Sequence, residues 1–589
     1  MSSSFINGLA KHIKSNYDLS KEELTVVFPN KRAAFYLRSK FMEIYEDNIW
    51  LPQMLSIEEA ITQWSGIQLV DIVDVLFELI TIDSELSDQE NNISIFGNMA
   101  VQMAKDFDEI DQYDVDADHL FSYIVEEKKI GVWHLDEATT LKERQYLRFF
   151  EHLGSYYHLL RQHLESQGKG YYGMMTRHLA HLDDAALVEK VRQRKVIFAG
   201  FNALTPTEQK IVDKLYRNHC AEVIWDFDRY YVEDPKNEAG YFARRYIDQN
   251  MPWKPASFSN RLLSKDKEIH LVSVVGNTIQ TKLLQSLLQV KVEDNCTVIL
   301  ADEKLMIPML NAIPDDPRFA SVKVSMGYPL RQTTLNNFVS EFFRLCRKGL
   351  KKREESLRWY IWPVLRILDL ELVRVVFTPE EIKELEDYKG YVRDKSVFLY
   401  DASEFERCCH SEDLRSFMDL LLGDESKAAG PIEFLSVLGK LLAFMANKVE
   451  GSGDSMLFFL NQISETGKVV NRLNGILKRF RSQVRSLEEL EILYLLVSDN
   501  TTIKLNSSAT GGLQVMGLLE TRNLDFDTFY MLGVNEGILP AEKSQGSFIP
   551  YPIRKEWGLP DDQEKQAVYA FHFYRLLQSV RRVYFVFNN

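Results

Sequence analysis

Residues 513–540 read LQVMGLLETRNLDFDTFYMLGVNEGILP and contain two short apolar runs separated by a charged loop. The runs LQVMGL (513–518) and TFYMLGV (528–534) have the length and the unbroken apolar character of strands buried on both faces. A helical pattern follows from residue 564, and a third apolar run, VYFVF, occupies 583–587. This alternation of strand and helix is typical of parallel sheets with crossover helices, so the stretch predicts an α/β domain.

Five more apolar runs of the same kind lie earlier in the chain. We expect two groups of strands, and therefore two parallel-sheet α/β cores, each carrying a large all-α insertion in a segment of helical periodicity. The first core is expected to comprise 1–70 with 185–265, the first helical insert 71–184, the second core 266–345 with 490–589, and the second insert 346–489. The five runs are LTVVF (24–28), KVIFAGF (195–201), AEVIWDF (221–227), EIHLVSVV (268–275) and CTVILA (296–301).

Composition narrows the class of protein. A chain of 589 residues with 45% apolar and 26% charged residues is long enough for several globular domains, each with its own core. The net charge of −15 argues against a protein that coats nucleic acid by bulk charge, although local basic grooves remain compatible with it. The five cysteines form no CxxC pair, and no apolar run is long enough to span a bilayer. We therefore expect a cytoplasmic protein without membrane contact.

Two further segments have sequences more specific than a strand and helix require. In VVFPNKRAAFYL (26–37), Asn30 and Lys31 lie at a strand-to-helix turn, where backbone N–H groups and a cation can meet a phosphate; a plain junction with a surface lysine is the alternative. In VIFAGFNALTPTEQKIVDKL (196–215), Thr205, Pro206 and Glu208 have the spacing of a helix start, with Thr205 as N-cap.

Taken in this order, these segments resemble the motor core of the UvrD, PcrA and Rep helicases. VFPNKRAA is similar to motif Ia, VIFAGFNALTPTEQ occupies the place of motif II, ETRNLDFDTFYMLGVNEGILP that of motif V, and the segment with Tyr574 and Arg575 that of motif VI. The more specific similarity is to AddB/RexB-type subunits of bacterial helicase–nucleases, at LETRNLDFD, NEGILP and GFNALTPTE. The resemblance implies two RecA-like cores in a UvrD-like superfamily 1 architecture, a role in DNA repair and recombination, and an AddA-type helicase/nuclease partner.

The chain departs from the motor family at the residues that hydrolyse ATP. No G-x-x-x-x-G-K-[ST] run, which cradles the phosphates and binds magnesium, occurs in it. Alignment with motif II places Ala199 and Gly200 where the family has its two carboxylates. Arg575 occupies the position where the family has its transition-state arginine, and Asp525 and Glu536 belong to the motif V segment. The alternative role for Arg575 is to anchor a helix to a sheet. The resemblance thus implies a vestigial nucleotide site without ATPase activity.

AddB-type proteins continue into a PD-(D/E)XK nuclease domain. The resemblance implies such a domain beyond Asn589, with magnesium and an iron–sulfur cluster, in a full-length ATP-dependent exonuclease subunit; it was either truncated from this chain or lost. Within residues 1–589 we find neither the nuclease motif nor clustered cysteines, so we expect no catalytic residue, metal or cofactor in them. The acidic run over 106–118 lacks calcium-loop spacing and is expected to be a solvated helix end.

Candidate DNA contacts are Asn30 and Lys31 at the strand-to-helix turn, together with basic or aromatic residues at a groove. One basic stretch runs from Arg344 through Lys351, Lys352 and Arg353, and a second contains Lys478, Arg479 and Arg481; a solvated helix face is the alternative for both. Trp225 and Tyr230 follow the motif II segment, where motor proteins stack aromatic side chains on bases, and a place in the core is their alternative.

Three functions are compatible with these observations. The first is a catalytically inert, helicase-like, DNA-binding subunit that scaffolds a partner motor in double-strand break repair. The second is an active ATP-dependent DNA helicase, against which the missing phosphate loop argues. The third is an interaction scaffold that kept the fold without binding DNA, which the net charge of −15 favours.

Overall fold

The computed structural model describes residues 4–589 in two compact units. Unit 1 comprises Met1–Ile82, Val101–Met326 and Asn506–Asn589, and unit 2 comprises Asp83–Ala100 and Gly327–Leu505. Within the chain, the structure does not describe residues 1–3, 20–22, 46–48, 87–92, 134–140, 193, 264–266, 291–295, 314–321, 354–355, 424–429, 450–453, 481–482, 505–512 and 541–545.

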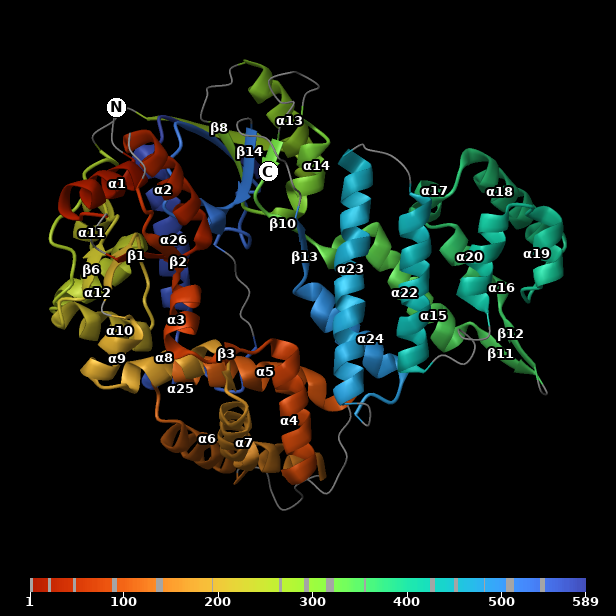
Figure 1. The fold of residues 1–589 in the computed structure, drawn as a ribbon, viewed down its shortest axis with the longest axis horizontal. Helices are drawn as coiled ribbons and strands as arrows, with labels where there is room; N and C mark the ends of the chain where they lie inside the picture. The colour runs from red at the N-terminus through yellow and green to blue at the C-terminus, as the bar shows by residue number, and fades with distance from the viewer. Residues whose placement is uncertain are drawn as a thin grey trace. The chain divides into compact units, whose positions relative to one another are not determined.

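Unit 1 contains a four-stranded parallel sheet in the order β2-β1-β5-β6 (Figure 1). Alternate residues of β1 point to opposite faces, as the pleat requires, and both faces are covered by helices. Val26 and Phe28 pack against α1 and α2, whereas Val27 packs against α3, α8 and α10. The strands are β1 (Leu24–Phe28), β2 (Gln53–Ser56), β5 (Lys195–Ala199) and β6 (Ala221–Ile224).

A second parallel sheet in unit 1 has six strands in the order β7-β16-β15-β8-β14-β9. Helix α26 (Asp562–Ser579) packs on the face that contains Phe529, Val583 and Phe585. The strands are β7 (Glu268–Val274), β8 (Cys296–Leu300), β9 (Val322–Val324), β14 (Leu513–Gly517), β15 (Thr528–Leu532) and β16 (Arg582–Asn588).

All eight apolar runs singled out in the sequence are strands, and the two predicted groups form the two sheets. An α/β fold with two parallel sheets is therefore confirmed. Strands β2 and β9, on the edges of the sheets, were not anticipated. Helix α10 begins as predicted, since Thr205 and Glu208 form a reciprocal capping box with Pro206 at the first helical position.

The other helices of unit 1 flank these sheets or belong to the helical segment between β3 and β4, and α4 and α5 extend in part into unit 2. Between β3 (Gln68–Leu69) and β4 (Lys169–Gly170), the chain is helical in the residues that the structure describes. The helices are α1 (Phe5–Asn16), α2 (Lys31–Ile44), α3 (Ile57–Ser65), α4 (Ile72–Leu86), α5 (Ile93–Gln112), α6 (Ala117–Trp133), α7 (Leu141–Ser166), α8 (Tyr172–His181), α9 (Asp184–Lys190), α10 (Pro206–Arg217), α11 (Arg229–Glu233), α12 (Tyr241–Asp248), α13 (Asn277–Val290), α14 (Met306–Leu310) and α25 (Tyr551–Glu556), with 3-10 turns η1 (Glu238–Gly240), η2 (Glu303–Leu305) and η5 (Leu518–Thr521).

Unit 2 is mainly helical, and its α22 and α23 run side by side (Figure 1). It also holds two small antiparallel pairs, β10 (Gly327–Pro329) with β13 (Thr502–Lys504) and β11 (Leu350–Arg353) with β12 (Ser356–Trp359). Its helices are η4 (Leu330–Gln332), α15 (Thr334–Lys348), α16 (Ile361–Leu368), α17 (Glu371–Val376), α18 (Pro379–Asp394), α19 (Ala402–Cys408), α20 (Glu412–Leu422), α22 (Pro431–Lys448), α23 (Asp454–Arg479) and α24 (Leu487–Asp499).

Candidate functional site

The β1–α2 junction, where a phosphate contact was predicted, is very short. Only Pro29 and Asn30 connect the strand to the helix. The Asn30 side chain accepts hydrogen bonds from the backbone N–H groups of Arg32 (3.2 Å) and Ala33 (3.4 Å). It therefore occupies the N–H groups that an anion at this helix start would need.

Helix α2 instead contacts neighbouring parts of unit 1. Lys31, on its first turn, forms an ion pair with Glu59 at 2.6 Å. The next residue, Arg32, donates to the backbone carbonyls of Ser325 (2.8 Å) and Glu520 (3.4 Å), which belong to the region of the six-stranded sheet. The basic start of α2 thus ties the two sheets together.

The pair that replaces the motif II carboxylates lies at another contact between the sheets. Ala199 ends β5 and is fully buried. Gly200 follows with φ +67°, and its carbonyl accepts a hydrogen bond from the Asn523 side chain at 2.9 Å. A Cβ atom at position 200 would lie 1.8 Å from Asn523 Nδ2 and 2.9 Å from Phe5 Cε1. Only glycine fits there, because both the backbone angle and the space exclude a side chain.

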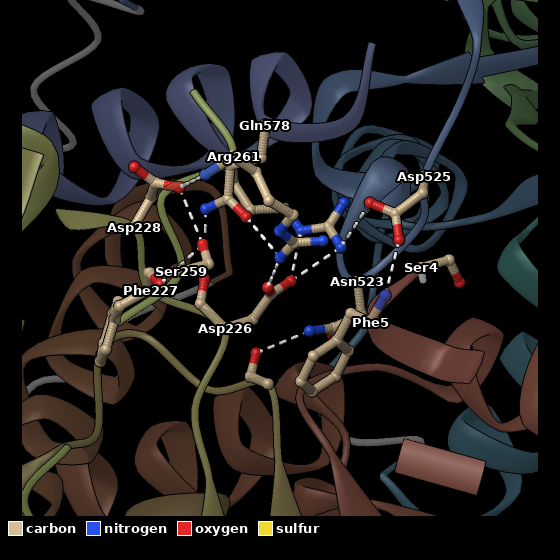
Figure 2. A network of polar contacts seen from close by, with 12 residues as sticks. Ser4, Phe5, Asp226, Phe227, Asp228, Ser259, Arg261, Asn523, Asp525 and Gln578 are labelled. Carbon is tan, nitrogen blue, oxygen red and sulfur yellow. Dashed lines mark hydrogen bonds and ion pairs between the residues drawn. The ribbon is translucent and has the colours of Figure 1, made fainter. Parts of the chain in front are cut away.

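Arg575 is the centre of a buried network between the sheets. Figure 2 labels other members of this network, among them Asp226, Arg261 and Asp525. It extends from α26 with 2% of its surface exposed, and its Nε and Nη2 contact Asp226 Oδ2 at 2.8 and 2.7 Å. Its Nη2 also lies 3.1 Å from Asp525 Oδ1, and its Nη1 donates to the carbonyl of Leu524. One guanidinium therefore joins Asp226, after β6, to the loop before β15.

Asp226 is shared with a second guanidinium. Its Oδ1 pairs with Arg261, whose Nη2 also donates to Gln578 Oε1 at 2.7 Å. The Gln578 amide donates to Tyr231 Oη at 2.8 Å. Figure 2 shows Asp226, Arg261 and Gln578 converging from different elements. Two carboxylates and two guanidiniums thus balance each other in the interior, which satisfies the requirement that buried charges be paired.

The network also fixes the start of the chain. Asp525 Oδ2 accepts a hydrogen bond at 2.8 Å from the backbone N–H of Phe5, the first residue of α1. Burial alone would raise the pKa of the Asp525 carboxyl, but Arg575 and Arg261 outweigh burial and lower this pKa. Burial, Arg522 and Arg575 together hold the pKa of His572 well below its usual value, so this imidazole is neutral. The arginines near this site therefore keep the Asp525 carboxyl ionised and the His572 imidazole neutral.

Not all of the expected nucleotide-site residues come together. The structure places Gly200, Asp525 and Arg575 around Asn523 and Asp226, as described above, whereas Glu536 is exposed on a turn. Of the expected nucleotide-site residues, Arg575 has the carboxylate partners expected of a residue that anchors a helix to a sheet.

The two predicted stacking aromatics lie on the border between core and surface. Trp225 stacks on Phe227 with ring centroids 5.1 Å apart, and its indole N–H donates to the carbonyl of Trp253. It also lines a 730 Å³ pocket that borders Asp226. Tyr230 is 42% exposed, which leaves part of its ring accessible.

The basic stretches of unit 2 differ in their local structure. Lys351, Lys352 and Arg353 lie in strand β11, not on the helix face weighed as the alternative, and their side chains are outside the described part. Lys478 and Arg479 are exposed in the last turn of α23, with the Arg479 guanidinium 5.0 Å from the Phe480 ring centroid. Arg481 lies outside the described residues.

The acidic run over 106–118 was expected to be a solvated helix end, and this expectation is wrong for two of its members. Asp106 and Asp111 are 4% and 0% exposed. Asp106 accepts from Ser547 Oγ and from the Phe548 N–H, both at 2.8 Å. Burial, in the main, raises the pKa of Asp106 to about 6. Among the described residues, no group of three or more Asp, Glu, His or Cys side chains is arranged to hold a metal ion.

Sequence reasoning missed Asp226, Arg261 and Asn523. A signal was present for Asp226, because a carboxylate inside the apolar run AEVIWDF must be either at the end of the strand or paired when buried. No comparable signal marks Arg261, which lies in an irregular loop.

These features define an α/β protein whose two parallel sheets are joined by a buried ion-pair network. No protein-family model and no curated protein matches the chain. Among the helices that the structure describes, none combines the length and the apolar character needed to cross a membrane.

Proposed function

We propose that this chain is an inactivated, helicase-like, DNA-binding subunit of a cytoplasmic helicase–nuclease complex that acts in double-strand break repair. In this proposal the two sheets are RecA-like cores of a UvrD-like superfamily 1 body of AddB type, and an AddA-type partner supplies ATP hydrolysis. The chain itself binds DNA and scaffolds the motor.

The observation that carries the proposal is the network around Arg575. In the motor family, an arginine at this position stabilises charge on a phosphate held between the two cores. Here the guanidinium is 2% exposed, forms ion pairs with Asp226 and Asp525, and donates a hydrogen bond to the Leu524 carbonyl. An arginine so placed serves to hold the sheets together, which is the role expected after ATP chemistry has been lost.

The state of the β1–α2 junction supports the same conclusion. A phosphate loop needs several backbone N–H groups that converge on one anion. With two connecting residues and the Asn30 side chain on the free N–H groups, the junction offers none of that arrangement.

A scaffold that does not bind DNA is the second candidate. It is favoured by the packing of Trp225 against Phe227 and Trp253, which uses much of that ring inside the protein. In both candidate functions the chain has no catalytic activity, and the two differ in whether the chain binds nucleic acid.

An ATP hydrolysis assay tests whether the chain lacks ATPase activity. We expect no phosphate release by the purified chain at saturating ATP and single-stranded DNA. A turnover of even about 1 s⁻¹, within the ordinary range for enzymes, would show that an active site exists and would support the active helicase instead.

Salt-dependent DNA binding separates the two inert candidates. We expect sequence-independent binding whose salt slope falls by up to about three units when Lys351, Lys352 and Arg353 are all changed to Glu. Lys236→Glu, an exposed lysine on unit 1, is the matched control. Absence of DNA binding by the full chain at low salt would favour the scaffold. Co-purification from native cells of a protein with an intact G-x-x-x-x-G-K-[ST] loop tests the partnership.

A further inference from the structure

A pocket of 690 Å³ lies between α7, α8 and β4, outside the network described above. Its lining includes Arg161, Lys169 and Arg177, with two histidines, and a single carboxylate, that of Glu165. Its volume falls within the range of small-ligand sites. The excess of permanent positive charge favours an anionic ligand.

Two arginines of this lining are held side by side by one buried carboxylate. Arg161 Nη1 and Arg177 Nη1 lie 2.8 and 3.1 Å from the same oxygen, Asp111 Oδ1. Tyr157 and Tyr171 donate to Asp111 at 2.6 and 2.7 Å, which fixes the carboxylate in place. Both guanidiniums are therefore preorganised, but Asp111 supplies only one negative charge for the two.

Two further acids lie near the pair. Asp114 lies 3.4 Å from Arg177 Nε and is shared with Lys210 and with His181 at 2.7 Å. Glu165 lies 3.5 Å from Arg161 Nη2. Three carboxylates therefore flank the two guanidiniums, and Lys169 is the further cation that makes the lining of the pocket favourable to an anion.

The solvent side of the pair determines where such an anion can enter. The guanidinium-bearing side chains of Arg161 and Arg177 are 25% and 21% exposed, and they separate two adjoining pockets. The other pocket, of 620 Å³, is lined by Asp114, Asp116 and Asp118 and therefore repels anions. The anion is expected in the 690 Å³ pocket, where Lys169 adds a flexible cation.

The rest of this pocket is apolar. Ile67, Met174 and Leu182 line it, and most of its surface is carbon. A methionine thioether packs favourably against aromatic rings. Burial and the nearby Lys190 lower the pKa of His178, so at neutral pH this imidazole offers a hydrogen bond and no charge.

We propose that the pocket between α7, α8 and β4 binds a nucleotide, with its phosphate on Arg161, Arg177 and Lys169 and its base against Met174 and Leu182. The phosphate can belong to a free nucleotide or to the end of a DNA strand. The strand-end form deepens the proposed function and rests on it, whereas the free-nucleotide form does not depend on DNA binding.

Calorimetric titration of the 589-residue chain with AMP and with adenosine tests the site. We expect AMP to bind at least tenfold more tightly than adenosine, because only AMP carries the phosphate. Lys169→Gln should weaken AMP binding at least threefold and leave adenosine unchanged; Lys169 lies outside the Asp111 cluster, so this variant should fold normally. The control is Lys236→Gln, an exposed lysine at a different pocket, which should change neither.

Two competition experiments identify the source of the phosphate. If 5′- or 3′-phosphorylated hexathymidylate displaces AMP and the unphosphorylated oligomer does not, the site receives strand ends. If neither displaces AMP, the site takes free nucleotides, and the proposal stands even where DNA binding fails. Equal affinity for AMP and adenosine, or equal effects of Lys169→Gln and Lys236→Gln, would overturn the proposal.

Discussion

Asp226 and Asp111 each hold two arginines, yet their surroundings give them different roles. At Asp226, the partner Arg575 is buried and Arg261 is 17% exposed, and a second carboxylate, Asp525, completes the charge balance. At Asp111, the partners Arg161 and Arg177 stay a quarter to a fifth exposed and line a pocket. Around the buried Arg575, the same chemical groups therefore form an internal lock between the sheets. Where both guanidiniums line a pocket together with Lys169, they form a candidate binding site.

Removal of Arg575 should have the largest effect on the lock. Arg575→Ala leaves two buried carboxylates without their shared cation, and we expect a loss of about 3–5 kcal/mol in the free energy of unfolding of unit 1. Urea unfolding followed by tryptophan fluorescence measures it. Arg229→Ala, which removes an exposed pair with Glu233 on α11, is the control and should cost under about 1 kcal/mol. Similar losses for both variants would mean that the network does not join the sheets.

Gly200→Ala tests how closely the sheets approach beside the lock. We expect a loss of about 2–3 kcal/mol, because alanine is strained at φ +67° and its Cβ would collide with Asn523. Thermal unfolding of the variant gives the size of the loss. Gly66→Ala, at φ +68° with open space around it, isolates the backbone contribution and should cost less. If the two glycine-to-alanine substitutions lower the stability equally, the close contact at Gly200 does not contribute to the loss.

Asp111→Asn probes the other member of the comparison. We expect a smaller loss of about 2 kcal/mol, since Arg161 and Arg177 can turn toward water when their shared carboxylate is neutralised. The same variant should lower the affinity for AMP by loosening both guanidiniums. Differential scanning calorimetry and AMP titration on one sample separate the two effects. A loss as large as that of Arg575→Ala would show that this cluster, too, is a closed structural lock.

Asp106 adds a carboxylate whose guanidinium is more distant, with Arg554 Nη1 at 3.8 Å. Its pKa, raised mainly by burial to about 6, means that the folded protein keeps a proton that the unfolded chain releases above about pH 4. Its contribution to stability is thus full at low pH and declines as the pH rises from 4 to 6. Relative to Asp106→Asn, the wild type should lose roughly 1–2 kcal/mol across that interval. Urea titrations of both proteins at pH 4, 5, 6 and 7 measure this; a constant difference would contradict the raised pKa.

The sequence predicted the sheets better than the sites. Buried parallel strands are continuous apolar runs, so β1 and β15 stand out, whereas β2 (QMLS) on the edge is half polar and does not. The basic residues of the paired strands β11 and β12 were compared with a solvated helix face, because a run of charged residues shows no hydrophobic periodicity that distinguishes a strand from a helix. The two groups of strands followed from the alternation of strand and helix, whereas the order of the strands within each sheet was not predicted.

The sites depend on partners that are far apart in the chain. Arg575 was singled out by resemblance, but its partner Asp226 is 349 residues away, and no local pattern connects them. Asp111 was expected in water because its neighbours are acidic; Tyr157, Tyr171 and the arginines that bury it come from α7 and α8. Whether a charged side chain can be buried depends on such hydrogen-bond donors, which are distant in the chain, and a single sequence does not reveal which residues will be partners.

The hydrogen bond from Phe5 to Asp525 spans 520 positions of the chain. At about 5–20 residues per second, a ribosome makes Asp525 roughly 25–100 s after Phe5. The apolar face of α1, which includes Ile6, Leu9 and Ile13, packs against β5 as well as β1, and β5 begins only at Lys195. During synthesis this helix therefore emerges before its docking surface is complete. The first turn of the protein is among the last to find its place, and in the cell nascent-chain chaperones are expected to cover it in the interval.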